Sequence, residues 1–536
     1  MSQKQPNILF LFSDQHSART LGCYGNPEVR TPHLDALAAS GVLMSRAYCN
    51  NPICTPSRMC FLSGQYAHNH RHYGLMGPAP ERLPSLFTHA RRHGYRTGMA
   101  GKIHTPAGWL ARDCDEVSDA YGHETPVTAA NGHQIVGAQG MERDAFTDEL
   151  ERRGLAALRD DKFLQETLER DPAARGVQAV DARQSRLHAA DTVEAWSADR
   201  AVNFIQGAER DGQPWCYWLT LPRPHQVYAP SPEFWNLYDG DSLTFPPNAD
   251  DDLAGRHPAA RQTQRRVQQQ TGWMHFEPKT WEAARRRVLR GYYGCVSQVD
   301  DAVGRVLAEL DRLGIRENTI VVYSTDHGEF AGEHGMIEKA PGIGFHCVTR
   351  VPMIWSWPGK LPAGEARDGL FESVDLLPTI AALAGWSPPD WVDGVEQRGL
   401  LEGGGEGKAC AVTENPLART IHTRRYKLTY YPPELQGGAE FGELFDLERD
   451  PWERTNLYFD PAHREVVVQL RQQLYDWLAR TIRTETEHPS APVIPGSGGS
   501  GNWTNWDLAG DLRAADGALK PHVRPELIRR GSVNYL

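Results

Sequence analysis

Short, mostly apolar runs that pass directly into polar residues dominate the chain. Residues 7–13 read NILFLFS and stop at Asp14, and residues 96–101, 214–221 and 319–325 end in the same way. Continuous apolar runs of this length are typical of strands buried on both faces of a parallel sheet. The polar residues that follow them are therefore expected at the carboxyl edge of the sheet, where α/β proteins place their ligands.

Segments with helical periodicity separate these runs. Thr31 and Pro32 predict the start of one helix, with Thr31 as N-cap and Pro32 at the first helical position. Residues 282–313 carry apolar side chains at helical spacing up to Gly314, and residues 370–384 predict a further core helix. Strands that alternate with helices predict an α/β fold with a large mixed, mostly parallel sheet flanked by helices.

The glycine-rich stretch at residues 400–407 predicts a boundary. Residues 410–431 and 441–447 beyond it resemble short antiparallel strands, and a helix is expected over about 462–482. We therefore expect an α/β domain over 1–400, a smaller α+β subdomain with a short antiparallel sheet over 401–485, and an irregular tail over 486–536. The tail could contact another subunit, so a homo-oligomer stays open.

Composition and charge exclude some classes of partner. The 536 residues include 40% hydrophobic and 23% charged residues, which is ordinary for a globular protein, and the formal net charge is -11. A negative chain is repelled by nucleic acids and anionic membranes, so neither is expected as a partner. No signal peptide or membrane span is recognised, and the nine cysteines have no framework spacing. A cytoplasmic protein with free thiols is therefore expected.

Three local patterns carry chemistry. The pentapeptide Cys54-Thr55-Pro56-Ser57-Arg58 holds a cysteine that is either an inert buried thiol or a thiolate activated by the neighbouring arginine. Asp14-Gln15 and Asp326-His327 each follow a predicted buried strand. Either acid could simply cap a turn, but two such pairs at strand ends can also converge on one metal ion.

The C-x-P-x-R pattern at Cys54 resembles the signature of type I sulfatases in the alkaline-phosphatase superfamily, in which the cysteine is converted to formylglycine. The continuation Leu62-Ser63-Gly64-Gln65 departs from the usual Leu-Thr-Gly-Arg. Further likeness lies in Gly101-Lys102-Ile103-His104, in Pro224-His225 and in the elements at 373–379 and 443–457. The resemblance covers about residues 7–480. It implies an alkaline-phosphatase-like fold and a formylglycine-generating enzyme as the maturation partner.

The resemblance also implies roles for particular residues. Lys102 and Lys339 would bind the sulfate group, His104 would contact the formylglycine and act as the base that releases sulfate, and His225 would be the general acid. Arg58 would orient the aldehyde hydrate. The implied ligands of one divalent metal ion are Asp14, Gln15, residue 54, Asp326 and His327.

The ligand types bear on the identity of the metal. Many sulfatases present an all-oxygen site that suits Ca²⁺, whereas His327 offers a nitrogen that suits a transition ion such as Mn²⁺ better. Both ions remain open, with a slight preference for Mn²⁺.

The expected activity is that of a sulfuric ester hydrolase of the arylsulfatase type, acting on a small-molecule or carbohydrate sulfate ester. One alternative is a phosphonate monoester or phosphodiester hydrolase of the same superfamily, in which the Asp-Gln and Asp-His pairs also occur. The intact Lys102 and His104 pair favours sulfate. The second alternative is a non-catalytic binder of sulfated glycans, which the complete set of catalytic residues disfavours.

Overall fold

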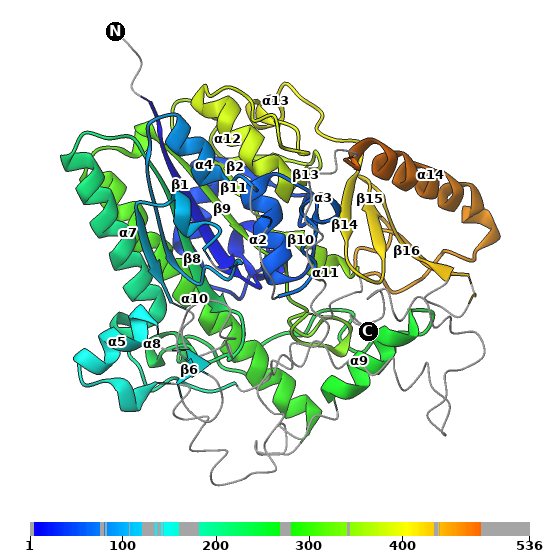
Figure 1. The fold of residues 1–536 in the computed structure, drawn as a ribbon. Helices are drawn as coiled ribbons and strands as arrows, with labels where there is room; N and C mark the ends of the chain where they lie inside the picture. Colours follow the sequence, from blue (N-terminus) through cyan, green and yellow to red (C-terminus); the bar gives the residue numbers. More distant parts are fainter. Residues whose placement is uncertain are drawn as a thin grey trace.

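A large mixed sheet forms the centre of the molecule (Figure 1). The computed structural model describes residues 5–75, 80, 83–106, 108–120, 135–136, 141–142, 144–159, 182–268, 280–339, 344–433, 438 and 440–483. The eight strands of the central sheet are, in spatial order, β12 (Glu365–Arg367), β2 (Val42–Met44), β11 (Ile354–Ser356), β9 (Thr319–Thr325), β1 (Asn7–Asp14), β8 (Trp215–Pro224), β4 (Arg96–Gly101) and β5 (Glu116–Asp119).

The five strands from β9 to β5 run parallel, and β11 pairs antiparallel with β9. All residues of β1 are buried because both faces of the sheet are covered. Ile8, Phe10 and Phe12 pack in a core with α2 (Cys54–Ser63), α4 (Leu86–Arg92) and α12 (Leu376–Ala384). Leu9 and Leu11 face α1 (Pro32–Ala39), α7 (Val193–Arg210) and α10 (Trp281–Arg312). The predicted fold class is confirmed.

The start of α1 differs from the prediction in how it is capped. Thr31 occupies the N-cap position and Pro32 follows it, but the Thr31 side chain makes no capping bond. Its hydroxyl donates instead to Asp35 and accepts from Gly22. The capping acceptor is Asp300 of α10, whose carboxylate accepts from the backbone N–H groups of His33 and Leu34 at 3.1 and 2.7 Å. A side chain distant in sequence thus satisfies the open helix end.

The predicted helix over 370–384 is shorter than expected. Phe371 and Glu372 form strand β13 and pair with β3 (Ala47–Tyr48), and a 3₁₀ turn over Ser373–Asp375 leads into α12. Apolar residues allow either a strand or a helix, and here pairing with β3 decides for the strand.

A separate antiparallel sheet follows the central sheet along the chain and lies on the right in Figure 1. Its strands are β14 (Ala411–Glu414), β15 (Arg419–His422), β16 (Tyr426–Tyr431) and β17 (Phe441–Asp446), and α14 (Arg464–Thr481) packs against them. The expected tail over 486–536 lies outside the described residues. Among the helices that the structure describes, none is both long and apolar enough to cross a bilayer.

Candidate active site

The carboxyl ends of four neighbouring strands deliver the polar residues expected from the sequence. Asp14 is the last residue of β1, and Asp326 directly follows β9. Lys102 follows β4 and His225 follows β8. These strands are parallel neighbours, so their ends lie side by side at one edge of the sheet. Cys54 reaches the same place from a different direction, as the first residue of α2.

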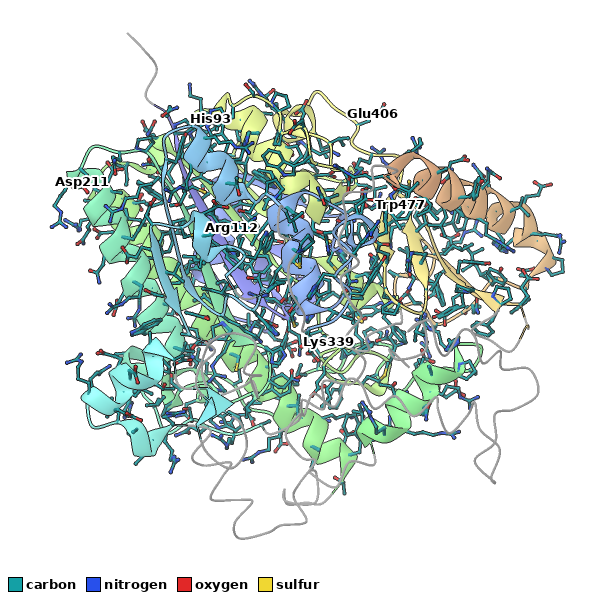
Figure 2. All side chains as sticks on the ribbon, viewed as in Figure 1. His93, Arg112, Asp211, Lys339, Glu406 and Trp477 are labelled. Atoms are coloured by element: carbon teal, nitrogen blue, oxygen red, sulfur yellow. The ribbon has the colours of Figure 1, made fainter. Side chains whose placement is uncertain are left out.

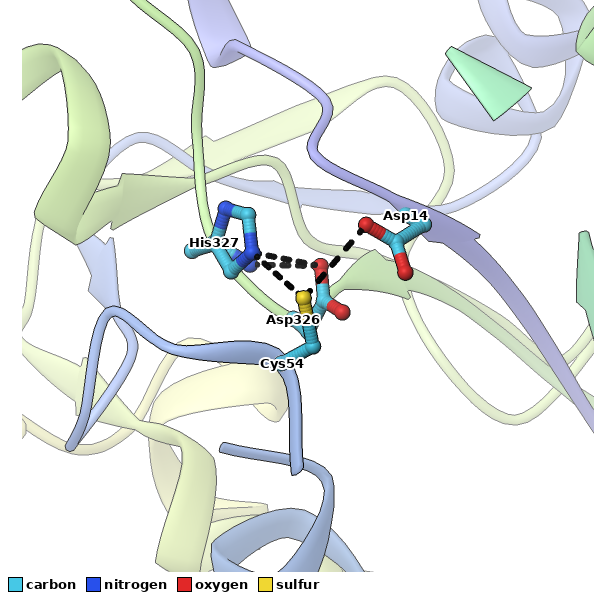
Figure 3. Close-up of side chains that lie close together, drawn as sticks. All are labelled: Asp14, Cys54, Asp326 and His327. Atoms are coloured by element: carbon cyan, nitrogen blue, oxygen red, sulfur yellow. Dashed lines mark hydrogen bonds and ion pairs between the residues drawn. The ribbon is translucent and has the colours of Figure 1, made fainter. Parts of the chain in front are cut away.

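Four buried side chains form a compact cluster at this edge (Figure 3). Asp14, Cys54, Asp326 and His327 each present one potential ligand atom, and these atoms lie within 4.8 Å of one another. The Cys54 Sγ lies 3.2 Å from His327 Nε2 and 3.9 Å from Asp14 Oδ1. Two carboxylates, one imidazole and the side chain of residue 54 can thus surround a single cation.

The imidazole of His327 is oriented as a metal ligand. Its Nδ1 lies 2.9 Å from the carbonyl oxygen of Gly328 and donates to it, which leaves the lone pair on Nε2 facing the cluster. Burial, with a smaller contribution from Lys339, lowers the pKa of His327 to about 4. The ring is therefore neutral at pH 7, as metal ligation requires.

Arg58 joins the two acids. Its Nε donates to Asp326 Oδ2 at 3.0 Å and a terminal nitrogen donates to Asp14 Oδ2 at 2.8 Å, and all three side chains are fully buried. The other terminal nitrogen donates to Thr220 Oγ1 and to the Lys102 carbonyl oxygen. The described hydrogen bonds of Arg58 thus go to the two carboxylates, to Thr220 of β8 and to the loop after β4. Its role toward an aldehyde hydrate at residue 54 stays a prediction.

Two lysines from different loops lie beside the cluster. Lys102 Nζ lies 3.0 Å from Asp14 Oδ2. Lys339, labelled in Figure 2, donates to Gln15 Oε1 at 2.8 Å and lies 3.3 Å from Cys54 Sγ. Burial alone would raise the pKa of Asp14, but Lys102, His225, Arg58 and Lys339 outweigh it and hold the pKa well below its usual value. The site therefore combines an ionised carboxylate with two lysine side chains, Lys102 and Lys339, whose positive charge suits an anionic substrate.

The two expected histidines lie near these lysines. Burial and then Lys102 and Arg58 hold the pKa of His104 well below its usual value, so the ring is neutral at pH 7. His225 donates from Nδ1 to the carbonyl oxygen of Gln226 at 2.7 Å. A proton that His225 transfers would accordingly be carried on Nε2.

Cys54 itself is a poor nucleophile as a thiol. Burial, helped by the negative charge of Asp14, raises its pKa to about 12. Without a bound cation the group is therefore a protonated thiol, which is the less reactive form.

Three further side chains around Gln15 were not anticipated from the sequence. Gln15 Nε2 donates to Gln226 Oε1 at 2.9 Å and to Glu329 Oε2 at 2.5 Å, and the Tyr228 hydroxyl donates to the same Glu329 oxygen. Glu329 stands two residues beyond His327, so an acid beside a proposed ligand pair was the available signal.

The mixed sheet thus carries a buried centre of acids, lysines and histidines at its carboxyl edge, where α/β proteins place their active sites. A family model described as Sulfatase matches residues 6–386, and a model described as N-sulphoglucosamine sulphohydrolase, C-terminal, matches residues 332–480. The first match covers more than half of the chain. The chain belongs to the sulfatase family, the group of sulfuric ester hydrolases to which its motifs pointed.

Individual relatives cover nearly the whole chain. The N-acetylglucosamine-6-O-sulfatase of Bacteroides thetaiotaomicron is 24% identical over 538 positions, which cover 88% of this chain and 86% of the relative. The phosphonate monoester hydrolase of Agrobacterium radiobacter superposes with a TM-score of 0.71 at 21% identity, over 89% of this chain and 96% of its own. A second solved structure, of a protein in complex with its substrate D-glucosamine-2-N,6-O-disulfate, superposes with a TM-score of 0.68 at 20% identity. The superposition covers 90% of this chain and 100% of the other. The two structural matches support the alkaline-phosphatase-like fold.

Proposed function

We propose that this chain hydrolyses sulfate esters, with residue 54 acting as formylglycine after oxidation of Cys54 by a formylglycine-generating enzyme. The observation that carries the proposal is the convergence of Cys54 with two carboxylates, one neutral imidazole and two lysines at the ends of parallel strands. By analogy with the N-acetylglucosamine-6-O-sulfatase relative, a sulfated carbohydrate is the first substrate class to test.

The donor set fits one divalent cation. Asp14, Asp326 and His327, with residue 54 and the amide oxygen of Gln15, would hold it. When bound, such an ion supplies positive charge to the sulfuryl oxygens and lowers the pKa of a hydroxyl on residue 54. Oxygen ligands suit Ca²⁺ and the imidazole nitrogen suits Mn²⁺, and we favour Mn²⁺ slightly.

The chain's own residues account for the remaining steps. A hydroxyl oxygen of the hydrated aldehyde attacks sulfur in line, while Lys102 and Lys339 stabilise negative charge on the sulfuryl oxygens. His225 donates the proton that the departing alcohol needs. His104 then takes the proton of the second hydroxyl of residue 54, the bond from carbon to the sulfate oxygen breaks, and the aldehyde is restored. Arg58 holds the carboxylates of Asp14 and Asp326 together and adds positive electrostatic potential beside them.

Mass spectrometry of the peptide that contains Cys54 tests the nucleophile, because formylglycine and cysteine differ in mass. We expect the aldehyde in active preparations and complete loss of aryl sulfate turnover in Cys54→Ala, with an unchanged circular dichroism spectrum. Turnover by an unmodified thiol, or by Cys54→Ala, would refute the proposal.

The second candidate is phosphonate monoester or phosphodiester hydrolysis. Gln15 and His327 favour it, since the Asp-Gln and Asp-His ligand pairs also occur in that branch, whereas the intact pair of Lys102 and His104 favours sulfate. Rates for an aryl sulfate, a phosphodiester and a phosphonate monoester on one preparation separate the two. A higher kcat/KM for the phosphonate would reverse the assignment, and absence of turnover with all three would support a sulfated-glycan binder.

A further inference from the structure

Gln15 poses a problem of orientation that an aspartate in its place would not. The two oxygens of a carboxylate are equivalent, but an amide has one oxygen that can bind a cation and one NH₂ group that cannot. A half-turn of the Gln15 amide would therefore replace a ligand with a donor that repels the metal. The site needs a means of keeping the oxygen inward.

The neighbours of the Gln15 amide distinguish its two ends. At one end, Lys339 Nζ, which can only donate, lies 2.8 Å from Oε1 and 3.3 Å from Cys54 Sγ, so Oε1 faces the cluster. At the other end, Nε2 donates to Glu329 Oε2 at 2.5 Å and to Gln226 Oε1 at 2.9 Å. The reversed amide would direct NH₂ at an ammonium group and its oxygen at Glu329 Oε2, which cannot donate to it while Glu329 is ionised.

Glu329 is itself held in place. Its Oε1 accepts from the backbone N–H of Ala331 at 3.2 Å and its Oε2 accepts from the Tyr228 hydroxyl at 3.3 Å. The side chain is 1% exposed. The backbone of Gln15 is fixed as well, because its N–H donates to Asp326 Oδ1 and its carbonyl accepts from the Tyr292 hydroxyl, both at 2.9 Å. With the backbone fixed, the contacts of the amide itself decide which way it faces, and Glu329 makes one of them.

We propose that Glu329 is a positioning residue that holds the Gln15 amide with its oxygen toward the metal cluster and thereby sets the affinity for the divalent ion. The inference rests on the proposed metal site. It explains how a glutamine can serve where an aspartate would need no such partner. Residues that orient a metal ligand commonly contribute about 10- to 100-fold in affinity.

The first test is Mn²⁺ binding to metal-free full-length protein by isothermal titration calorimetry. Glu329→Gln keeps the shape of the side chain, but its amide can donate as well as accept and so no longer selects one orientation of Gln15. We expect about 10- to 100-fold weaker Mn²⁺ binding. In the Gln15→Ala background, where no amide remains to be oriented, the same change should have no further effect.

An exchange variant provides the rescue. In Gln15→Glu/Glu329→Gln, either carboxylate oxygen at position 15 can face the ion, while the amide at 329 can donate to the other, and the net charge is conserved. Mn²⁺ affinity should return to within about 3-fold of wild type, in contrast to Glu329→Gln alone. Because the exchange is read out separately, it tests the proposal even where the single variant folds poorly.

Glu338 supplies the matched control. Its carboxylate is also buried near Glu329 and Lys339, but among the described contacts no hydrogen bond joins it to Gln15. Glu338→Gln should leave Mn²⁺ affinity within about 3-fold of wild type. An equal loss in Glu338→Gln, an undiminished loss in the Gln15→Ala background, or no rescue by the exchange would overturn the inference. Failure of the wild-type protein to bind Mn²⁺ or Ca²⁺ would instead refute the metal site of the proposed function.

Discussion

Replacement of Arg58 by methionine tests how the buried acids are held together. The guanidinium makes charged hydrogen bonds of 3.0 and 2.8 Å to Asp326 and Asp14, and all three groups are fully buried. Removal of one partner from a buried ion pair costs about 3–5 kcal/mol, because a charge stays buried without compensation. Loss of two charged hydrogen bonds, worth about 1.5–3 kcal/mol each, gives a similar decrease in the free energy of unfolding. Lys102 remains beside Asp14, so most of the loss should fall on Asp326.

Unfolding in urea with EDTA present can be followed by tryptophan fluorescence and circular dichroism. For Arg58→Met, the lower free energy of unfolding should appear as a lower midpoint of the transition that includes the central sheet. A bound divalent ion can take over part of the charge compensation. Binding that is specific to the folded state adds about 4 kcal/mol when the free ion is at about 1,000 times its Kd. Excess Mn²⁺ should raise both midpoints, and that of Arg58→Met more, because without the guanidinium the two carboxylates hold the ion more tightly. The difference between the variant and the wild type should therefore become smaller.

Arg152→Met is the matched control, because Arg152 is an exposed residue of α5 (Ala145–Arg152) that pairs with Glu149 one turn away. Its midpoint should equal that of the wild type in both media. An Arg58→Met midpoint no lower than that of Arg152→Met would refute the structural reading of Arg58. A large loss that Mn²⁺ does not reduce would refute the link between Arg58 and the metal site.

Three other outcomes are expected. EDTA treatment should abolish aryl sulfate turnover, and added Mn²⁺ should restore it better than added Ca²⁺. In His327→Asn the preference should shift toward Ca²⁺. Assays of restored turnover with both ions check this, and an unchanged metal preference would count against His327 as a ligand. His225→Ala should slow esters with poor leaving groups far more than activated aryl esters, and equal losses would exclude the general-acid role. Burial raises the pKa of Asp300 to about 7, above its unfolded value, so its contribution to stability falls as the pH rises from about 4 to about 7. Asp300→Asn should remove that part of the pH dependence of the urea midpoint, and parallel pH profiles of variant and wild type would contradict this.

Patterns that depend on near neighbours were readable from the sequence. The run ending in Asp14 predicts a buried strand with an acid at its tip, and β1 ends at that residue. The run over 319–325 predicts the strand before Asp326 in the same way. Because parallel strands share one carboxyl edge, these local patterns were enough to propose that Asp14 and Asp326 converge at one site. The place of Lys102 beside them came from the family resemblance. The roles assigned to those residues stay proposals.

Tertiary structure alone decided which partner each buried polar group takes. Arg58 lies 268 residues from Asp326, and Gln15 lies 314 residues from Glu329. From the sequence alone, many acidic residues of the chain are equally suitable as the hydrogen-bond partner of Arg58 or of Gln15. Packing of the sheet against α2 and the loop after β9 buries a few of them together, and burial makes every unpaired charge or amide costly. That requirement, which acts only in the folded chain, selects Asp300 as the cap of α1 and Glu329 as the partner of Gln15.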